Sequence, residues 1–368
     1  MRTTGILVAA ISTVLTAAYG VAQHVFVVSP IPGPGVFSSQ IQPAVDAASD
    51  GDIVLVKPIL TGPYQGFAIA GKSLAIVRDS GNVFVNDVEI AGLGPAQRVV
   101  LQRLQLGFSS TPFAPLHVHD GSGCTWVDGG RFDSATDAVD AIDAGALVLN
   151  GCVALASEIA EAGGAGLLSQ GTAVAWTDPE CTGGHGGGPG VQTDGPTYVS
   201  GGKIDGGPSG AGTAPAISMS GPVVLLDCLL NVSSGPPAVG GTPTVLHDKA
   251  RHFAIGSPVR EGHTTIVDFQ GEPNEVVAAF VSEGVSPAVA SPLPGLNAPL
   301  WIDPATLVAT VVFGTTDLSG HLGATIPIGG LPPGVDGTTL FVQSVFVSPQ
   351  GTPHLGPARA LVILDSSL

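Results

Sequence analysis

The stretch IQPAVDAASDGDIVLVKP, residues 41–58, passes from a helical pattern into an apolar strand without a linker. Ile41, Val45 and Ala48 fall on one face of a short helix, and the Asp-Gly pair at 50–51 ends it. A short amphipathic helix of this kind can cover the exposed end of a stack of strands. We therefore predict a capping helix near 39–50, followed by the first strand of a stack.

The start of this helix has two interpretations. Ser39 and Gln42 have the spacing of a capping box, in which each side chain bonds the other residue's backbone N–H. Pro43 would then remove a backbone donor inside the helix, and a helix that begins at Pro43 avoids that loss.

The composition favours an all-β protein with many tight turns. The 368 residues include 53 Gly and 31 Pro, and 44% are hydrophobic while only 11% are charged. Such a chain can bury a large core, so the Gly and Pro indicate turns. The net charge of −17, with only 12 Lys and Arg, excludes nucleic acid as a partner because phosphate binding needs clustered bases.

The N-terminus, MRTTGILVAAISTVLTAAYGVAQ, is typical of a signal peptide. A single Arg precedes a short apolar stretch, and small residues follow it as a cleavage site would require. We expect residues 1–22 to be removed, and the mature protein to be secreted or on the cell surface without membrane insertion.

Short apolar runs that end in a polar turn residue repeat about every 24 residues. A solenoid of β-coils has a regular step of this size. A leucine-rich repeat is the rival at this period, but the runs contain mostly Val and Ala. The residues that end the runs are Lys57, Arg78, Gln102, Asp128, Asn150, Asp178, Ser200, Asp227 and then His247 or Asp248.

The run IQPAVDAASDGDIVLVKP…YQGFAIAGKSLAIV resembles the entry cap and first coils of exported bacterial parallel β-helix proteins of the pectin-lyase-like superfamily. The resemblance implies a right-handed parallel β-helix over 23–263 with an N-terminal capping helix. The pattern changes after 263, where seven strand candidates in 105 residues indicate a small antiparallel β-sandwich over 264–368. It resembles a module that follows repeats in exported bacterial proteins.

The polar column predicts the first candidate site. If Asp227 and Asp248 occupy the same turn of adjacent coils, their carboxylates lie about 5 Å apart. That spacing suits the acid and nucleophile of a retaining glycosidase, or Ca²⁺ binding, as in polysaccharide lyases of the superfamily. The structural alternative is that Asp and Asn favour turns by bonding their own backbone. We expect no cofactor other than Ca²⁺.

Three short motifs resemble polygalacturonase-type signatures: GGHGGG at 183–188, QTDG at 192–195 and GGKID at 201–205. The His motif precedes the Asp motif, the expected Asp pair is absent, and Gln192 and Lys203 replace Asn and Arg. His185 is then either a ligand-binding residue or an exposed turn residue. A further acidic segment, DSATDAVDAIDAG at 133–145, is expected to be a solvated loop or a short surface helix.

Four cysteines, Cys124, Cys152, Cys181 and Cys228, allow two disulfides in an exported protein. In the coil register, Cys152 and Cys181 are close enough to pair. Alternatively, all four are small buried residues.

These features predict an exported β-helix protein that binds a glycan or contributes to the cell surface without catalysis. The alternative is a glycoside hydrolase or polysaccharide lyase that acts in the β-helix groove, so catalysis is uncertain. Because acids outnumber bases 29 to 12, a neutral polysaccharide is the better partner. The candidate ligand-binding residues are Trp126, Trp176, Tyr198, Asp178 and His185, and the aromatic residues qualify if they face outward.

Overall fold

The computed structural model describes residues 23–59, 62–107, 114–156, 163–209, 212–232, 238–286, 296 and 298–368. The described chain falls into two compact units. The solenoid unit comprises residues 26–249, and the C-terminal unit comprises 250–286 and 298–368 together with 23–25. The predicted signal peptide at 1–22 lies outside the described residues.

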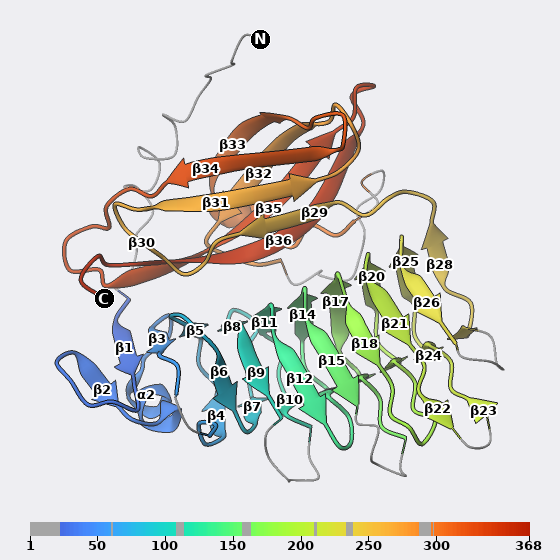
Figure 1. Cartoon of the computed structure of the whole chain (residues 1–368), viewed down its shortest axis with the longest axis horizontal. Coiled ribbons are helices and arrows are strands. Elements are labelled where there is room, and N and C mark those ends of the chain that lie inside the picture. The colour runs from blue at the N-terminus through green and yellow to red at the C-terminus, as the bar shows by residue number, and fades with distance from the viewer. Residues whose placement is uncertain are drawn as a thin grey trace. The chain divides into compact units, whose positions relative to one another are not determined.

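The solenoid unit is a parallel β-solenoid of about eight turns (Figure 1). This confirms the predicted all-β fold class and parallel β-helix. Successive turns add one strand to each of three sheets, so neighbours in a sheet are about one turn apart in sequence.

The strands of each sheet are given in spatial order. The eleven-stranded sheet contains β2 (Val36–Ser38), β1 (Val25–Val28), β3 (Ile53–Val56), β5 (Leu74–Arg78), β8 (Arg98–Gln102), β11 (Cys124–Asp128), β14 (Ala146–Asn150), β17 (Ala173–Thr177), β20 (Thr197–Ser200), β25 (Val223–Leu226) and β28 (Thr244–Leu246). The eight-stranded sheet contains β27 (Val239–Gly240), β24 (Ile217–Met219), β19 (Val191–Thr193), β16 (Leu167–Gln170), β13 (Val139–Ile142), β10 (Leu116–His119), β7 (Val88–Ala91) and β4 (Phe67–Ala70). The seven-stranded sheet contains β26 (Leu229–Asn231), β21 (Lys203–Asp205), β18 (Glu180–Thr182), β15 (Val153–Ala156), β12 (Arg131–Ser134), β9 (Leu104–Leu106) and β6 (Val83–Val85).

The hydrophobic core runs through the middle of the coils. Alternate residues of each strand point inward, as the period of two in a β-strand requires, and they stack on the equivalent residues of the next coil. In β14 these are Leu147 and Leu149, which are fully buried in the core cluster. Paired positions are separated by 20 residues at Leu226↔Leu246 and by 27 at Asn150↔Thr177. The predicted step of about 24 is therefore an average over loops of unequal length.

The capping helix α2 (Ile41–Ala47) forms where the sequence predicts it, and it buries Ile41, Ala44 and Val45. Its start differs from both predictions. Gln40 is the N-cap and makes no side-chain capping bond, so there is no capping box. Pro43 is the third helical residue, where its missing N–H would have no intrahelical partner in any case.

The turn after the eleven-stranded sheet requires a left-handed backbone. Arg103, Asp178 and Asp227 have φ of 56°, 49° and 52°, and glycines take the equivalent places in other coils. This geometry lets the turn residue bond the next coil, as when the Asp178 N–H donates to the Ser200 carbonyl at 2.8 Å. Asp and Asn tolerate this conformation better than most residues.

A buried polar row lies at the ends of the strands in the eleven-stranded sheet. Pairing aligns Gln102, Asp128, Asn150, Thr177 and Ser200. The Asn150 Nδ2 donates to Asp128 Oδ1 at 2.8 Å, and the Thr177 hydroxyl donates to Asn150 Oδ1 at 2.8 Å. The row thus links three coils through side chains.

We predict that Asn150→Ala destabilises the protein by about 1–3 kcal/mol, because it takes a hydrogen-bond partner from two buried groups. The melting temperature should fall by several degrees, which thermal unfolding followed by circular dichroism would measure. Asn231→Ala is the matched control, since Asn231 is exposed on β26 and its loss should change little. Equal melting temperatures for the two variants would contradict the role of the polar row.

The C-terminal unit contains two sheets. A three-stranded antiparallel sheet has the order β29 (His252–Ile255), β31 (Thr264–Gln270) and β34 (His321–Pro327). A five-stranded mixed sheet has the order β30 (Val259–Arg260), β36 (Pro353–Leu364), β35 (Gly337–Val347), β32 (Val276–Ser282) and β33 (Leu307–Thr315). One buried cluster draws Phe269 from the first sheet and Phe346 from the second.

The strand pairing ends the β-helix before the predicted boundary at 263. The last solenoid strand is β28, and β29 pairs antiparallel with β31 of the C-terminal unit. A buried ion pair holds this segment there, since Arg251 Nη2 lies 2.6 Å from Glu275 Oε1. The five-stranded sheet is mixed because β30 runs parallel to β36. Among the described residues, the candidate strand APLWID has bridge residues at Pro299 and Ile302, of which Ile302 pairs with Val285, and it forms no longer strand.

All four cysteines are free, so of the two alternatives for Cys152 and Cys181 the structure has the unpaired one. The Cys152 thiol donates to the Val127 carbonyl, whereas that of Cys181 donates to the Gly190 carbonyl at 3.0 Å. The two thiols are therefore directed to different parts of the coil. Within the described part of the chain, no helix has the length and apolar character that a membrane crossing requires.

Candidate functional site

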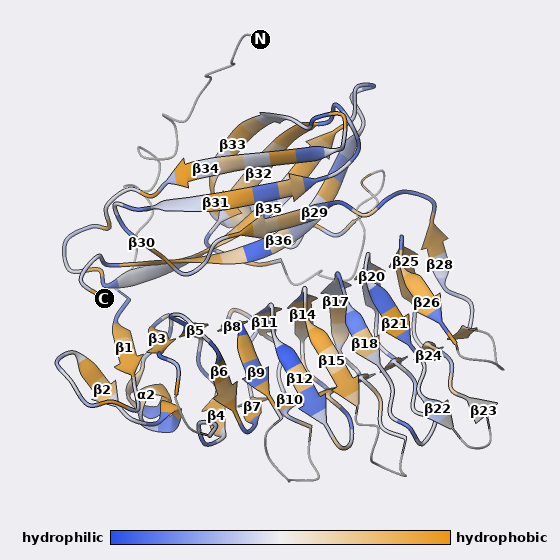
Figure 2. Cartoon of the chain, in the orientation of Figure 1, coloured by the Kyte–Doolittle hydropathy of each residue, from blue (hydrophilic) through white to orange (hydrophobic). Residues whose placement is uncertain are grey.

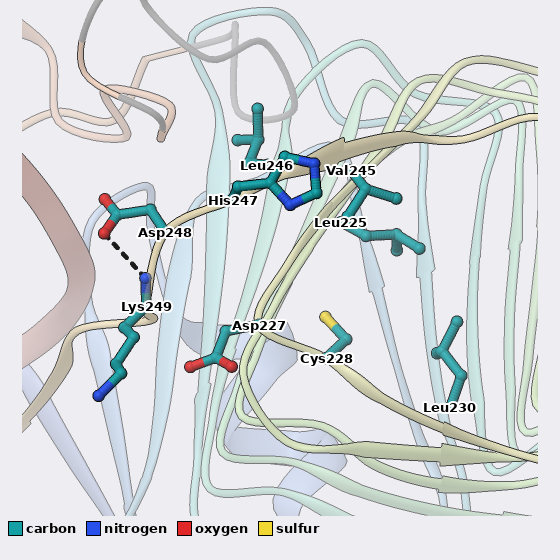
Figure 3. Close-up of a pocket in the computed structure, with 9 residues that line it drawn as sticks. All are labelled: Leu225, Asp227, Cys228, Leu230, Val245, Leu246, His247, Asp248 and Lys249. Carbon is teal, nitrogen blue, oxygen red and sulfur yellow. Dashed lines mark hydrogen bonds between the residues drawn. The ribbon is translucent and has the colours of Figure 1, made fainter.

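The predicted pair of carboxylates lies beside a pocket at the C-terminal end of the solenoid. The residues that line it are Leu225, Asp227, Cys228, Leu230, Val245, Leu246, His247, Asp248 and Lys249. Figure 3 shows that the carboxyl group of Asp248 points away from Asp227. Asp248 Oδ1 instead accepts a hydrogen bond from the backbone N–H of Lys249 at 2.8 Å.

Strand register explains this separation. Because Leu226 pairs with Leu246, continuing the register places Asp227 beside His247 and shifts Asp248 one residue further. The predicted polar column is in fact two rows. Asp128, Asn150 and Ser200 end strands, whereas Asp178 and Asp227 occupy the left-handed turns.

This geometry does not support Ca²⁺ binding by Asp227 and Asp248. Calcium takes six to eight oxygen ligands, and the two carboxylates do not converge. In the ranges that the structure describes, no group of three or more His, Cys, Asp or Glu residues is arranged to hold a metal ion. Burial raises the pKa of the neighbouring Cys228 thiol to about 12, which disfavours the thiolate form that a nucleophilic cysteine requires.

We predict that Asp227→Gly preserves or raises the melting temperature, because glycine occupies the same left-handed turn at Gly129, Gly151 and Gly201. Asp227→Val should destabilise the solenoid by about 1–2 kcal/mol, the cost of a left-handed backbone for a residue with a side chain that cannot bond locally. Thermal unfolding of both variants measures the difference. A larger loss for glycine than for valine would show that the carboxylate, and not the backbone, matters here.

The three aromatic candidates are buried. Trp126 and Trp176 are 0% exposed and Tyr198 is 1% exposed. Trp176 belongs to the solenoid core cluster. None presents a ring face on which a sugar could stack in this structure.

His185 lies in an exposed turn of the Gly-rich loop, which agrees with the structural alternative. The glycines around it have a packing reason. A Cβ on Gly188 would overlap the backbone of Gly164 in the preceding coil, and a Cβ on Gly207 would overlap that of Gly184. Close packing between coils therefore explains the glycines that resemble a polygalacturonase signature.

The other parts of those signatures have separate partners. Asp194 Oδ1 accepts from the Gly171 N–H at 2.6 Å, and Lys203 forms an ion pair with Asp205. No contact brings either residue to His185 among the described residues.

A cluster of histidines and carboxylates lies on the outward face of the eight-stranded sheet. His119 Nδ1 lies 2.8 Å from Asp120 Oδ2, and its Nε2 lies 3.0 Å from Glu89 Oε1. His117 Nδ1 lies 3.0 Å from Asp140 Oδ2. The two imidazole rings have centroids 4.5 Å apart.

Register and strand alternation create this cluster. His117 and His119 are two residues apart on β10, so both side chains leave the same face of the sheet. Pairing places His117 between Glu89 on β7 and Asp140 on β13. Asp120 follows the strand in a left-handed turn with φ of 54°.

Sequence reasoning missed both histidines. The alternating pattern LHVHD at 116–120 was a usable signal, since H-x-H on a strand puts two imidazoles side by side. The segment 133–145 was also wrongly predicted as a loop or helix, because β12 and β13 occupy parts of it. The contact between Asp140, which lies in this segment, and His117 was therefore not predicted.

The cluster favours a charged imidazole. The hydrogen bond to Asp120 is the main reason that the pKa of His119 is raised, and the hydrogen bond to Glu89 adds to it. Since the folded pKa exceeds the unfolded value of about 6.5, the stabilisation is complete below that value and is lost as pH rises through the folded pKa.

We predict that His119→Gln lowers the melting temperature more at pH 5.5 than at pH 9. The wild type carries a stabilising imidazolium at pH 5.5 and loses this charge as the pH rises, whereas glutamine is neutral at both pH values. Thermal unfolding of both proteins across this range measures the difference. The double substitution Glu89→Gln with Asp120→Asn should remove the same pH dependence while leaving the imidazole in place. A pH-independent difference between wild type and His119→Gln would show that the ion pairs contribute nothing.

No protein-family model matches the chain. No curated protein matches it significantly either.

Proposed function

We propose that the protein is an exported β-solenoid that binds an extracellular or cell-surface polysaccharide without cleaving it. The observation that carries the proposal is one row of outward side chains across six strands of the eight-stranded sheet. Pairing aligns Glu89, His117, Asp140, Leu168, Gln192 and Ser218.

This row has the properties of a surface for a linear polymer. Five of its six side chains can form hydrogen bonds, and neighbouring strands are about 4.8 Å apart. A polysaccharide that lies along the solenoid would present hydroxyls at every coil. The parallel sheet is rigid, so little order has to be gained on binding.

Charge favours a neutral polymer. The row contains Glu89 and Asp140, and the whole chain carries a net charge of −17. An acidic polysaccharide would be repelled in the absence of a basic cleft. The signal-peptide pattern and the resemblance to exported pectin-lyase-like proteins support export.

We predict that the purified protein binds insoluble neutral glucans or xylans, and that polygalacturonate binds less. Replacing His117 and Gln192 with Ala should weaken binding about tenfold, because two hydrogen bonds of about 0.5–1.5 kcal/mol each are lost. Co-sedimentation with the polymers gives the dissociation constants. Gln105→Ala is the matched control, since Gln105 lies on β9 in the seven-stranded sheet.

Binding to none of the polymers would refute the proposal. Equal losses for Gln105→Ala and for the double variant would refute the assignment to this face. Either result would leave the fold unchanged.

A second candidate function, polysaccharide cleavage, is favoured by one observation. The Asp140 carboxylate bonds His117 Nδ1 at 3.0 Å, and this arrangement orients an imidazole whose Nε2 can act as a general base. A lyase needs such a base. Release of reducing ends or unsaturated products, abolished by His117→Ala, would support cleavage, whereas binding without products supports the non-catalytic module.

A further inference from the structure

One imidazole on the outward face of the eight-stranded sheet is held between two carboxylates. His119 Nδ1 lies 2.8 Å from Asp120 Oδ2, and His119 Nε2 lies 3.0 Å from Glu89 Oε1. An ionised carboxylate accepts hydrogen bonds but donates none. Both ring nitrogens must therefore carry a proton if both bonds are to form, and only the imidazolium has two N–H groups.

Loss of a proton from His119 must break one of these two bonds. A neutral imidazole has one N–H and one lone pair, and the lone pair repels the carboxylate that it faces. The bond to Asp120 is the shorter of the two, and it contributes most to the raised pKa of His119. Glu89 has the longer side chain, with more rotamers available to it once it is free. Deprotonation of His119 therefore releases Glu89 and keeps the bond to Asp120.

The other residues packed around His119 were considered element by element. In register, His119 pairs with Ala91 on β7 and with Ile142 on β13, neither of which is charged. The imidazole of His117 lies beside it, with ring centroids 4.5 Å apart, and bonds Asp140 at 3.0 Å. The titratable groups near His119 are thus this second histidine with its carboxylate, and the two carboxylates that bond His119 itself.

Glu89 belongs to the row of outward side chains that we propose to bind the polysaccharide. It pairs with His117 in that row, and its side chain is 54% exposed, so its second carboxylate oxygen can accept a hydroxyl. A side chain that is already held in place loses less conformational freedom when a ligand binds. The ion pair with His119 therefore prepares Glu89 for binding.

We propose that His119 is a pH-dependent positioning residue of the polysaccharide site: its protonated form holds Glu89 in the binding row, and its deprotonation releases Glu89 and weakens binding. This inference rests on the proposed function, since it concerns the regulation of the same row. A neutral polymer has no charge that pH could change, so a change in affinity reports a change in the protein.

Charged residues on the seven-stranded sheet differ from this cluster in how they respond to pH. Figure 2 shows hydrophilic residues on β12, where Arg131 Nε lies 2.8 Å from Asp133 Oδ2. The arginine of this pair stays charged throughout the range from pH 5.5 to pH 9. The pair therefore persists where the bond between His119 and Glu89 is lost.

The first test measures co-sedimentation of the protein with insoluble glucan and insoluble xylan at pH 5.5 and pH 9. We expect the dissociation constant of the wild type to be about two- to tenfold higher at pH 9, which is the cost of ordering one free side chain. His119→Gln should remove this dependence, because glutamine is neutral at both pH values. Thermal unfolding establishes that each variant is folded.

Asp120→Asn gives the opposite expectation. The asparagine amide can donate to the Nδ1 lone pair, so a neutral imidazole can keep its proton on Nε2 and still hold Glu89. Binding at pH 9 should then be as tight as at pH 5.5, and asparagine tolerates the left-handed turn at this position.

His321→Gln is the matched control. His321 Nε2 lies 2.8 Å from Asp268 Oδ2 in the C-terminal unit, and the pKa of His321 is also raised by that hydrogen bond. This variant removes a histidine of the same kind from outside the solenoid. It should keep the pH dependence of the wild type.

A second measurement needs no polymer. The ¹⁵N chemical shifts of histidine-labelled protein show which ring nitrogen keeps its proton as the pH rises, and His119→Gln identifies the signals of His119. We expect the neutral ring of the wild type to carry its proton on Nδ1, toward Asp120. In Asp120→Asn the proton should move to Nε2.

The outcomes separate this inference from the proposed function. Equal affinities of the wild type at both pH values would overturn the inference while leaving polysaccharide binding intact. A neutral wild-type ring with its proton on Nε2, or a pH dependence that persists in His119→Gln, would overturn it as well. Binding to neither polymer at either pH would refute the proposed function, and the inference with it.

Discussion

The hydrogen bonds that join each coil to the next are the interaction on which the rest of the solenoid depends. Backbone donors of one coil meet carbonyls of its neighbour, as when Gly129 donates to Asn150 at 2.8 Å and Gly151 donates to Thr177 at 2.8 Å. Because buried backbone groups have to be paired, every coil must follow nearly the same path. The left-handed turns and the closely packed glycines follow from this requirement.

The same constraint determines what the surface can do. Once the coils are stacked, residues about one turn apart in sequence become neighbours about 4.8 Å apart. His117 therefore meets Asp140 and Glu89 through register alone. The outward face of the eight-stranded sheet therefore aligns single residues that come from successive coils.

The coils at the two ends of the stack lack a neighbour on one side. An interior coil is covered on both sides, but a terminal coil exposes its core and its strand edges. At the N-terminal end, the seven-residue helix α2 covers the core of the first coil. At the other terminus Val245 remains half exposed, so the core is covered less completely there.

The sequence by itself determined the fold class, because the signals that specify it are local. The Asp-Gly stop after Ala48 and the alternation within each apolar run reflect backbone geometry over a few residues, so the helix, the strands and the repeat could be predicted. The sequence also offered a turn as the structural alternative for Asp178, and the structure places this residue in a left-handed turn.

Only the tertiary structure decided which residues meet. A shift of one residue in register separates Asp227 from Asp248, and unequal loops make such shifts invisible in a sequence. The same uncertainty hid the contact of His117 with Asp140, which are 23 positions apart. Burial of Trp126 and the transfer of β29 to the C-terminal unit likewise depend on packing between distant segments, and local patterns carry no information about it.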